Sequence, residues 1–207
     1  MLLTGDIGGT KTHLAIFSSE KGPHEAIIDR IYPSGQYANL ETIVQAFMAE
    51  VNLPIERAVF GVAGPVTRGQ ASITNLPWVI RESRLQEVLR VDTVTVINDL
   101  QAVAYAVPFL KPADLHTLND GDVEPQGPIA IIAPGTGLGE AYLTWDGNHY
   151  RAYASEGGHA DFGPTNELEM SLLRYMLRLY DHVSYEKVCS GLGIRNLYFF
   201  LKNTGYA

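Results

Sequence analysis

The sequence predicts an α/β protein with two lobes, and three observations support this prediction. Apolar and β-branched runs that are typical of buried strands alternate with segments of helical periodicity. A strand, a glycine-rich turn and a second strand occur twice, around Gly5–Thr12 and around Pro134–Gly139. Between these repeats, residues 111–128 are rich in proline and glycine. We therefore predict a small N-terminal lobe over residues 1–110, a linker over 111–128, and part of a larger lobe over 129–207.

Composition restricts the class of protein. Of the 207 residues, 46% are hydrophobic and 18% are charged, which is typical of a globular chain that can bury a core. The net charge is −8 without any basic run, which argues against nucleic acid or an anionic membrane surface as the main partner. The single Cys189 allows no internal disulfide and favours a reducing compartment. Because we find neither a signal peptide nor an apolar stretch of membrane-spanning length, we expect a cytoplasmic protein.

The first lobe begins with a hairpin over residues 2–18, and an extended run over 27–32 adds to the same sheet. Apolar side chains then recur at helical spacing from Leu40 to Val51, which predicts an amphipathic helix. Asn39 precedes this helix and is a favourable N-cap residue. The other elements predicted for this lobe are a buried strand over 57–62, a short strand over 73–78, a helix over 82–89, a buried strand over 93–97 and a helix over 100–107.

The second lobe begins with another glycine-turn hairpin, over residues 129–145. A loop over 155–164 then combines several glycines with two acids and a histidine. Asn166, followed three residues later by Glu169, is typical of a capping box at the start of a helix. The helices predicted for this lobe cover residues 167–179, a segment that starts near Ser184, and residues 194–201 ahead of Gly205.

Both glycine turns are candidate sites for phosphate. Glycine adopts backbone angles that other residues avoid and lets a ligand come close, so the N–H groups of such a turn can bind an anion. For either turn alone, an ordinary hairpin turn is the alternative. The first turn comes near a Walker A pattern, but Thr10 replaces its second glycine and a strand follows instead of a helix, so we reject that motif. Asp6, beside this turn, could hold Mg²⁺ through the water molecules of the ion.

Five further polar residues have the chemistry of a binding or catalytic site. Asn98 and Asp99 follow a buried strand, where ligands gather in α/β sheets; they could cap the next helix, or Asp99 could accept a proton from a substrate hydroxyl. Glu156 and His159 lie in the glycine-rich loop, where solvated charges are the alternative. Glu186 lies in the first turn of a predicted helix, where a carboxylate is favourable in any case. Together these groups suit a polyol, because its hydroxyls both donate and accept hydrogen bonds. One cysteine leaves a zinc site poorly supplied with ligands.

These residues resemble the motifs of the bacterial glucokinase family, which is part of the sugar kinase and actin-like ATPase superfamily. The resemblance runs essentially from end to end of the chain and keeps the order of the family, so five motifs together are much more specific than one. The segments that resemble the two phosphate motifs, the catalytic-base segment and the two sugar-binding segments are Asp6–Thr10, Ala133–Gly139, Ile97–Ala102, Glu156–Phe162 and Ser184–Gly191.

The resemblance implies a bilobal actin-like ATPase fold, related to ribonuclease H, with an active site in the cleft. Each lobe would be a mixed sheet with flanking helices that opens with a glycine-turn hairpin. Glucose would be phosphorylated on its 6-hydroxyl by ATP and Mg²⁺, with Asp99 as the general base and Asp6 near the metal. The implied sugar contacts are Asn98, Asp99, Glu156, His159, Glu186 and Gly137. The implied ATP contacts are Ile7, Gly8, Gly9, Thr10, Lys11, Thr12, Gly135, Thr136 and Gly137.

One departure from the family concerns its adenosine-binding segment. We find no glycine-rich stretch that resembles it between Glu167 and Ala207, so we expect an amino-terminal portion with an incomplete second lobe. An incomplete lobe exposes apolar surface, which favours instability or association, such as a homodimer. Two alternatives stay open: a kinase for another hexose, such as N-acetylmannosamine or fructose, and a catalytically silent sugar-binding fragment. The single cysteine, and the lack of room for a helix-turn-helix before Asp6, separate the chain from the related zinc-containing kinases and DNA-binding repressors.

Overall fold

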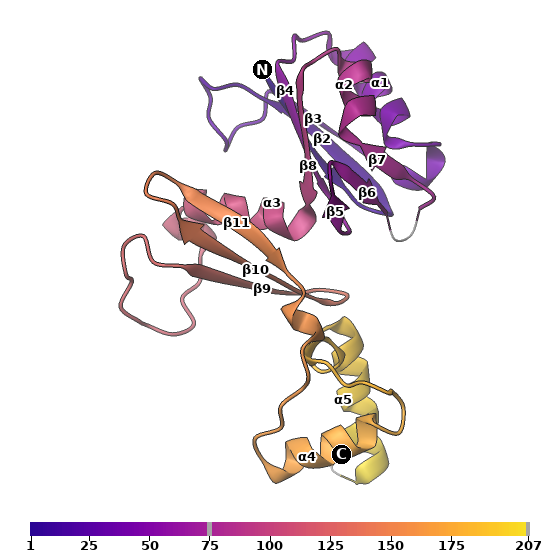
Figure 1. Ribbon diagram of the computed structural model, residues 1–207, viewed down its shortest axis with the longest axis vertical. Coiled ribbons are helices and arrows are strands. Elements are labelled where there is room, and N and C mark those ends of the chain that lie inside the picture. Colours follow the sequence, from indigo (N-terminus) through magenta and orange to yellow (C-terminus); the bar gives the residue numbers. More distant parts are fainter. Residues whose placement is uncertain (74–75, 206–207) are drawn as a thin grey trace. The chain divides into compact units, whose positions relative to one another are not determined.

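The computed structural model describes residues 1–73 and 76–205, which form two compact units (Figure 1). The first unit is Met1–Val103 and the second is Ala104–Ala207. The division falls within a helix, ahead of the linker that we predicted over 111–128. Proline and glycine mark irregular backbone, whereas the limit of a compact unit depends on which segments pack together. That the two units are lobes with separate roles remains a prediction.

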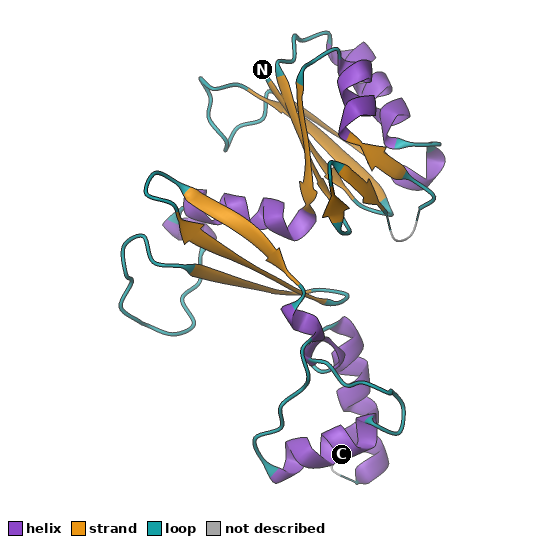
Figure 2. Cartoon of the chain, in the orientation of Figure 1, coloured by secondary structure: helices purple, strands orange, loops and turns teal. Residues whose placement is uncertain are grey.

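Five strands form the main sheet of the first unit, in the order β3-β2-β1-β4-β8 (Figures 1 and 2). Strand β1 (Leu2–Ile7) runs antiparallel to β2 (Lys11–Phe17) and parallel to β4 (Arg57–Val62). Strand β3 (Ile28–Pro33) pairs with β2 in antiparallel orientation, and β8 (Thr93–Asn98) pairs with β4 in parallel orientation. All five strands were predicted from apolar runs, and the mixed sheet with flanking helices confirms the predicted fold class.

The register of the parallel strands places three chain segments at one edge of this sheet. Ile7 is paired with Val62, and Val62 is paired with Asn98, so β1, β4 and β8 end at the same level. The first glycine turn follows Ile7, and Asp99 follows Asn98. Ligands of α/β proteins bind at this carboxyl edge of a sheet.

Helices α1 (Leu40–Val51) and α2 (Glu82–Leu89) pack against each other in the first unit. Helix α1 begins as predicted, because Asn39 Oδ1 accepts a hydrogen bond from Thr42 N–H at 2.9 Å. Helix α2 lacks a side-chain cap; the Glu82 carboxylate instead accepts a bond from the Val96 N–H of β8 at 2.8 Å. The core between helices and sheet includes the fully buried Leu3, Ile7, Leu14, Ile16, Leu40, Ile43, Val44, Phe47, Phe60 and Leu85.

A small second sheet of the first unit was not predicted. It consists of β5 (Val66–Thr67), β6 (Gln70–Ser72) and β7 (Val79–Arg81), in that order. We predicted a strand over 73–78 instead; residues 74–75 of it lie outside the described residues, and the remainder forms a loop. The loop closes through a bond from Ile73 N–H to the Trp78 carbonyl, and both side chains are buried, so the apolar pattern reflects core packing rather than strand pairing.

Helix α3 (Asp99–Ala106) follows β8 and ends, as predicted, near Pro108, which lies in a 3-10 helix over Val107–Phe109. The chain is then exposed over residues 111–126, where the regular structure is a single 3-10 turn at Pro112–Asp114. This segment has the exposure and irregular backbone that its proline and glycine content predicts.

The sheet of the second unit contains three antiparallel strands in the order β11-β10-β9. Strands β9 (Ile129–Pro134) and β10 (Leu138–Trp145) form the predicted hairpin around the second glycine turn. Strand β11 (Tyr150–Ser155) was missed, because it alternates tyrosine, alanine and arginine without an apolar run. It is specified by the turn that returns the chain from β10.

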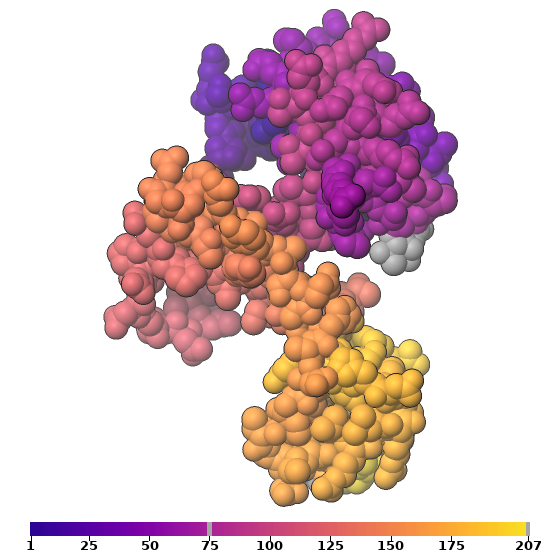
Figure 3. Space-filling model, in the orientation of Figure 1, coloured from indigo at the N-terminus to yellow at the C-terminus, as the bar shows by residue number. Residues whose placement is uncertain are grey.

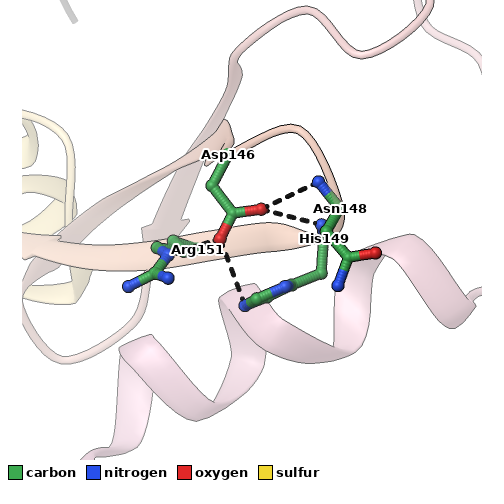
Figure 4. Close-up of polar contacts among 4 residues, drawn as sticks. All are labelled: Asp146, Asn148, His149 and Arg151. Carbon is green, nitrogen blue, oxygen red and sulfur yellow. Dashed lines mark hydrogen bonds and ion pairs between the residues drawn. The ribbon is translucent and has the colours of Figure 1, made fainter.

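That turn is organised by the carboxylate of Asp146 (Figure 4). Its Oδ1 accepts bonds from the backbone N–H groups of Asn148 at 3.0 Å and His149 at 2.9 Å, and Oδ2 accepts one from Arg151 Nε at 2.6 Å. Gly147 supplies the positive φ of 100°. The His149 N–H, Arg151 and the Asn148 N–H hold the pKa of Asp146 well below its usual range. The hydrogen bonds of this turn therefore favour the ionised form of the Asp146 carboxylate.

Helices α4 (Glu167–Met176) and α5 (Gly191–Thr204) complete the second unit and form one packed block, orange to yellow in Figure 3. The buried residues shared by this block are Leu172, Met176, Val183 and Phe200. Helix α4 ends three residues earlier than predicted. Asn166 caps it, but Glu169 Oε2 accepts a bond from Thr165 N–H at 2.6 Å, so the predicted capping box is replaced by a bond one residue further back.

Two further predictions about the second unit were wrong. The segment near Ser184 forms only a 3-10 turn, Tyr185–Lys187, instead of a helix. Helix α5 begins at Gly191 rather than at residue 194, because Ser190 caps it and glycine in its first turn conceals its start in the sequence. Among the described residues, no helix has both the length and the apolar composition needed to cross a bilayer.

Candidate active site

The first glycine turn joins β1 to β2 and is supported by two buried hydroxyl groups. Gly8 N–H donates to the Lys11 carbonyl at 3.0 Å, which closes the turn. Ser34 supports it twice: its N–H donates to the Thr10 carbonyl at 3.0 Å, and its Oγ donates to the Gly8 carbonyl at 2.8 Å. Thr12 Oγ1 lies 3.0 Å from Ser34 Oγ, and both residues are fully buried. The carbonyl side of the turn is therefore fixed by the protein itself.

The other side of this turn has the groups that an anion needs. In the described part of the chain, the N–H groups of Gly9 and Thr10 have no acceptor, and the Lys11 side chain is exposed. Ile7 and Thr12 differ from these, because their side chains are fully buried and only backbone groups could contact a ligand. The structure thus divides the residues predicted to contact ATP into an exposed set and a supporting set.

Asp6 is an exposed carboxylate on β1, opposite His13 of β2. Within the described residues, no group of three or more histidine, cysteine, aspartate and glutamate side chains is close enough to hold a metal ion. Mg²⁺ does not require such a group, because it keeps several waters and commonly uses one or two carboxylates together with substrate phosphates. One exposed carboxylate beside a turn whose N–H groups could bind an anion therefore fits a water-mediated contact.

Asn98 and Asp99 connect β8 to α3 and combine the two functions that the sequence left open. Asn98 Oδ1 accepts bonds from the N–H groups of Leu100 at 3.0 Å and Gln101 at 3.2 Å, so Asn98 does cap α3. Its Nδ2 donates to the Gly64 carbonyl at 3.1 Å and to Asp99 Oδ1 at 3.0 Å. Asp99 Oδ1 also accepts from Leu100 N–H at 2.8 Å. Both bonds to the Asp99 carboxylate end on Oδ1, so Oδ2 of Asp99 has no partner among the described residues.

The second glycine turn is held by a segment some fifty residues away in the sequence. Gly135 N–H donates to the Gly137 carbonyl at 2.8 Å, and the Gly135 carbonyl accepts a bond from Gly191 N–H at 2.8 Å. Leu138 N–H donates to Glu186 Oε2 at 3.0 Å. In the described part of the chain, the N–H groups of Thr136 and Gly137 have no acceptor, as in the first turn.

The glycine-rich loop that contains residues 156–159 also reaches this turn. Gly158 lies so close to the Leu138 carbonyl that a side chain at this position would overlap it. Gly137 is equally close to the Glu186 carboxylate. The structure thus brings together, within one unit, the second glycine turn, the 156–159 loop and Glu186, as the sequence-based site required.

Glu156 and His159 belong to this cluster but face solvent. Glu156 precedes a 3-10 helix over Gly157–His159 and His159 ends it, and their side chains are 84% and 62% exposed. His159 Nε2 lies 3.7 Å from Glu156 Oε2, a distance at which the pair is still free to accept or donate to a ligand. Both side chains are therefore accessible to a polar molecule.

Sequence reasoning missed two serines that support the site. Ser34 fixes the first turn, and Ser190 connects Glu186 to α5. The signal for Ser190 was present, because serine three residues before Gly193 and ahead of an apolar periodic run is a typical N-cap. Ser34 has no such local signal, since its partners Gly8 and Thr12 are distant in the sequence.

The chain is similar to known proteins over nearly its whole length. A family model described as Glucokinase matches residues 3–206. The glucokinase of Nostoc punctiforme is 44% identical over 212 residues, which cover 100% of this chain and 62% of that protein. The crystal structure of a glucokinase from an Antarctic psychrotroph is 31% identical with a TM-score of 0.88, and the match covers 99% of this chain and 65% of that one.

A more distant structure agrees in fold alone. The ROK family glucokinase from Streptomyces griseus, solved with glucose and AMPPNP, is 21% identical with a TM-score of 0.53 over 92% of this chain and 58% of its own. These neighbours confirm the predicted actin-like ATPase fold. The chain spans 62% of the length of the Nostoc punctiforme glucokinase and 61% of that of a second glucokinase, from Nostoc sp..

Proposed function

The chain belongs to the glucokinase family, and on this basis we propose that it carries out the ATP-dependent phosphorylation of glucose on the 6-hydroxyl. The observation that best supports the proposal is the position of Asp99. It follows β8 at the sheet edge where the first glycine turn follows β1, and its Oδ2 is unused by the described residues. A carboxylate placed in this way can act on a hydroxyl while the turn holds a phosphate.

In the proposed reaction, Asp99 Oδ2 accepts the proton of the 6-hydroxyl as that oxygen attacks the γ-phosphorus of ATP, and ADP leaves. Asn98 positions Asp99 by donating to its Oδ1, and the same bonds fix the start of α3. Negative charge spreads over the transferring oxygens in this step, so backbone N–H groups and Lys11 lower its free energy. Bound Mg²⁺ would neutralise part of the phosphate charge, and Asp6 would hold it through water.

The proposed contacts to ATP and glucose are those that the sequence predicts. The N–H groups of residues 9–10 and 136–137, which have no acceptor among the described residues, would donate to phosphates, whereas Ile7 and Thr12 would take part through the backbone or as support. Gly8 and Gly135 shape the two turns. The proposed sugar contacts are Asn98, Asp99, Glu156, His159, Glu186 and Gly137, which supply amide, carboxylate, imidazole and backbone groups to hydroxyls.

The test is glucose-dependent release of ADP by the purified 207-residue chain. Asp99→Asn should lower this rate by about 100-fold or more, because a general base contributes on this order, while its melting temperature stays unchanged. Asp92→Asn, which neutralises an exposed aspartate before β8, is the matched control and should keep full activity. Turnover of Asp99→Asn within a few-fold of the parent would contradict the assignment.

Binding measurements on the same chain separate the two alternatives. Calorimetric binding of glucose without ADP release and without binding of AMPPNP would support a sugar-binding protein that does not catalyse phosphorylation. If N-acetylmannosamine or fructose competes better than glucose, the kinase acts on another hexose. Neither result is expected under the proposal, which predicts that glucose binds best and that AMPPNP binds as well.

Two properties of the whole protein complete the proposal. We place it in the cytoplasm, because its one cysteine, Cys189, is a free and exposed thiol that fits a reducing compartment. We also propose a homodimer, because Ile132, Tyr142 and Tyr153 of the second-unit sheet are exposed. Sedimentation velocity at several protein concentrations tests this; a single monomeric species throughout would contradict it.

A further inference from the structure

The connection between Glu186 and the second glycine turn has a consequence beyond sugar contact. Glu186 uses only Oε2 for the Leu138 N–H at 3.0 Å, and in the described chain Oε1 has no partner. One carboxylate can therefore hold the turn with one oxygen and a sugar hydroxyl with the other. The bond from Gly191 N–H to the Gly135 carbonyl, at 2.8 Å, fastens the opposite side of the same turn.

Ser190 fixes the segment that carries both of these bonds. It is 5% exposed, and its Oγ donates to the Glu186 carbonyl at 2.5 Å while accepting a bond from Gly193 N–H at 3.1 Å. A single hydroxyl thus ties the backbone of Glu186 to the first turn of α5. Since Gly191 follows Ser190 directly, both contacts to the glycine turn depend on the position of this hydroxyl.

The surrounding contacts leave this segment little freedom to compensate. The Lys187 carbonyl accepts a bond from Asn196 Nδ2 at 2.9 Å, and Asn196 Oδ1 in turn accepts one from the Tyr180 hydroxyl at 3.1 Å. Gly193 lies too close to the Val188 carbonyl to carry a side chain. The backbone of residues 186–190 is thus packed on α5. Within this segment, the Ser190 hydroxyl holds the end that carries Glu186.

We propose that Ser190 is a positioning residue that holds Glu186 against the second glycine turn and thereby couples sugar binding to phosphate binding. The coupling part rests on the proposed function, in which Glu186 contacts the sugar and the turn contacts ATP. Coupling of two ligands is reciprocal, so glucose and an ATP analogue each raise the affinity for the other by the same factor. Loss of the Ser190 hydroxyl lets Glu186 move independently of the turn and brings this factor toward one.

Three substitutions separate positioning from capping. Ser190→Ala removes both hydrogen bonds of the hydroxyl. Ser190→Asn keeps an acceptor of the kind with which Asn39 and Asn166 cap α1 and α4, but it lacks the hydroxyl aimed at the Glu186 carbonyl. Ser190→Thr keeps the hydroxyl. The matched control is Asn166→Ala, which removes the α4 cap without contact to the glycine turn.

The first measurement is amide hydrogen exchange at Leu138 in the unliganded chain. We expect Ser190→Ala to accelerate it by about fivefold, which corresponds to the loss of one ordinary hydrogen bond, while Asn166→Ala and Ser190→Thr leave it unchanged. Ser190→Asn should melt like the parent and still exchange faster at Leu138. Unchanged exchange in Ser190→Ala, or equal acceleration in Asn166→Ala, would overturn the positioning role.

The second measurement is calorimetry with glucose, alone and with saturating AMPPNP. We expect Ser190→Ala and Ser190→Asn to bind glucose several-fold more weakly and to lose most of the gain from AMPPNP, and we expect Ser190→Thr to restore both. If AMPPNP raises the glucose affinity of Ser190→Ala by a factor within twofold of the factor in the parent, the coupling is overturned. If the parent binds no glucose, the proposed function and the coupling are both contradicted, whereas the exchange at Leu138 still decides the positioning role.

Discussion

The two glycine turns are similar in sequence and are supported in opposite ways. The first is held by the hydroxyls of Ser34 and Thr12, which are fully buried and uncharged. The second is held by the carboxylate of Glu186 and the N–H of Gly191, on a segment that also carries proposed sugar contacts. The first turn is thus a fixed part of a core, whereas the second shares its support with a ligand.

The sheet that carries the first turn is also more deeply buried than the sheet that carries the second. Strands β1 and β2 belong to a five-stranded sheet, with Leu3, Ile7 and Leu14 fully buried. Strands β9 and β10 belong to a three-stranded sheet that leaves Ile132 67% exposed. We infer that substitutions near the first turn act mainly on stability, and that substitutions near the second turn act on both stability and ligand binding.

The largest effect on stability is expected for Gly158→Ala. The new methyl group would overlap the Leu138 carbonyl, and backbone must shift to relieve this overlap, which costs about 3 kcal/mol. Denaturation followed by the fluorescence of Trp145, in a variant that lacks Trp78, measures it in the second unit. Gly121→Ala, at an exposed position with open space, is the control. A loss of unfolding free energy no larger than that of the control would show that the 156–159 loop is not packed on the second glycine turn.

The next largest effect is expected for Ser34→Ala. It removes the bond to the Gly8 carbonyl and leaves the buried Thr12 hydroxyl without its partner, which costs about 2 kcal/mol. Denaturation followed by Trp78 fluorescence, in a variant that lacks Trp145, measures it in the first unit. Adding Thr12→Val removes the orphaned hydroxyl and should recover part of the loss. A double variant less stable than Ser34→Ala would contradict this account of the first turn.

Tyr32→Phe should stabilise the first unit by about 1 kcal/mol, because it removes a buried hydroxyl without a partner among the described residues. The ring keeps its edge contacts with Tyr37 and Phe47. Burial raises the pKa of the same hydroxyl, in agreement with an environment that disfavours its ionised form. Equilibrium denaturation checks the sign, and a clear loss of stability would indicate that the hydroxyl is bonded in the folded protein.

The smallest effect is expected at Asp146, whose carboxylate is accessible and screened by solvent. Because its folded pKa is lowered, its contribution to stability is complete above the unfolded value near 3.8 and is lost as the pH falls through the lower folded value. Asp146→Asn should therefore be slightly less stable at pH 7, and the difference should disappear in acid. A difference that grows on acidification, measured in the second unit, would contradict the sign.

The sequence predicted those parts of the fold that local patterns specify. The strands of the five-stranded sheet, α1 with its Asn39 cap, and both glycine hairpins follow from apolar periodicity and turn composition. Strand β11 and the small β5-β6-β7 sheet could not be predicted in this way, since pairing and the Asp146 turn specify them. The 3-10 turn near Ser184 was mistaken for a helix, because a cap residue and a first-turn glutamate also occur where the helix does not continue.

The sequence predicted the polar residues of the candidate site but not the residues that support them. Asp99, Glu156 and Glu186 were identified because polar residues after strands and glycines stand out in the sequence. The supporting residues Ser34 and Ser190 were not identified, because they act through contacts that form only in the folded chain. A helix cap was one of the two interpretations left open for Asn98 and Asp99, and the structure shows that Asn98 both caps α3 and holds Asp99.

The most direct test of the central claim, that the glycine turns bind phosphate, is the affinity of Gly135→Ala for AMPPNP. Gly135 is exposed at the second turn, its φ is not positive, and a methyl group there meets no atom within 4 Å, so the variant should fold and melt like the parent. We predict that calorimetry will show an affinity at least about tenfold weaker, because the methyl group occupies the space a phosphate needs. An affinity within twofold of the parent would contradict the claim.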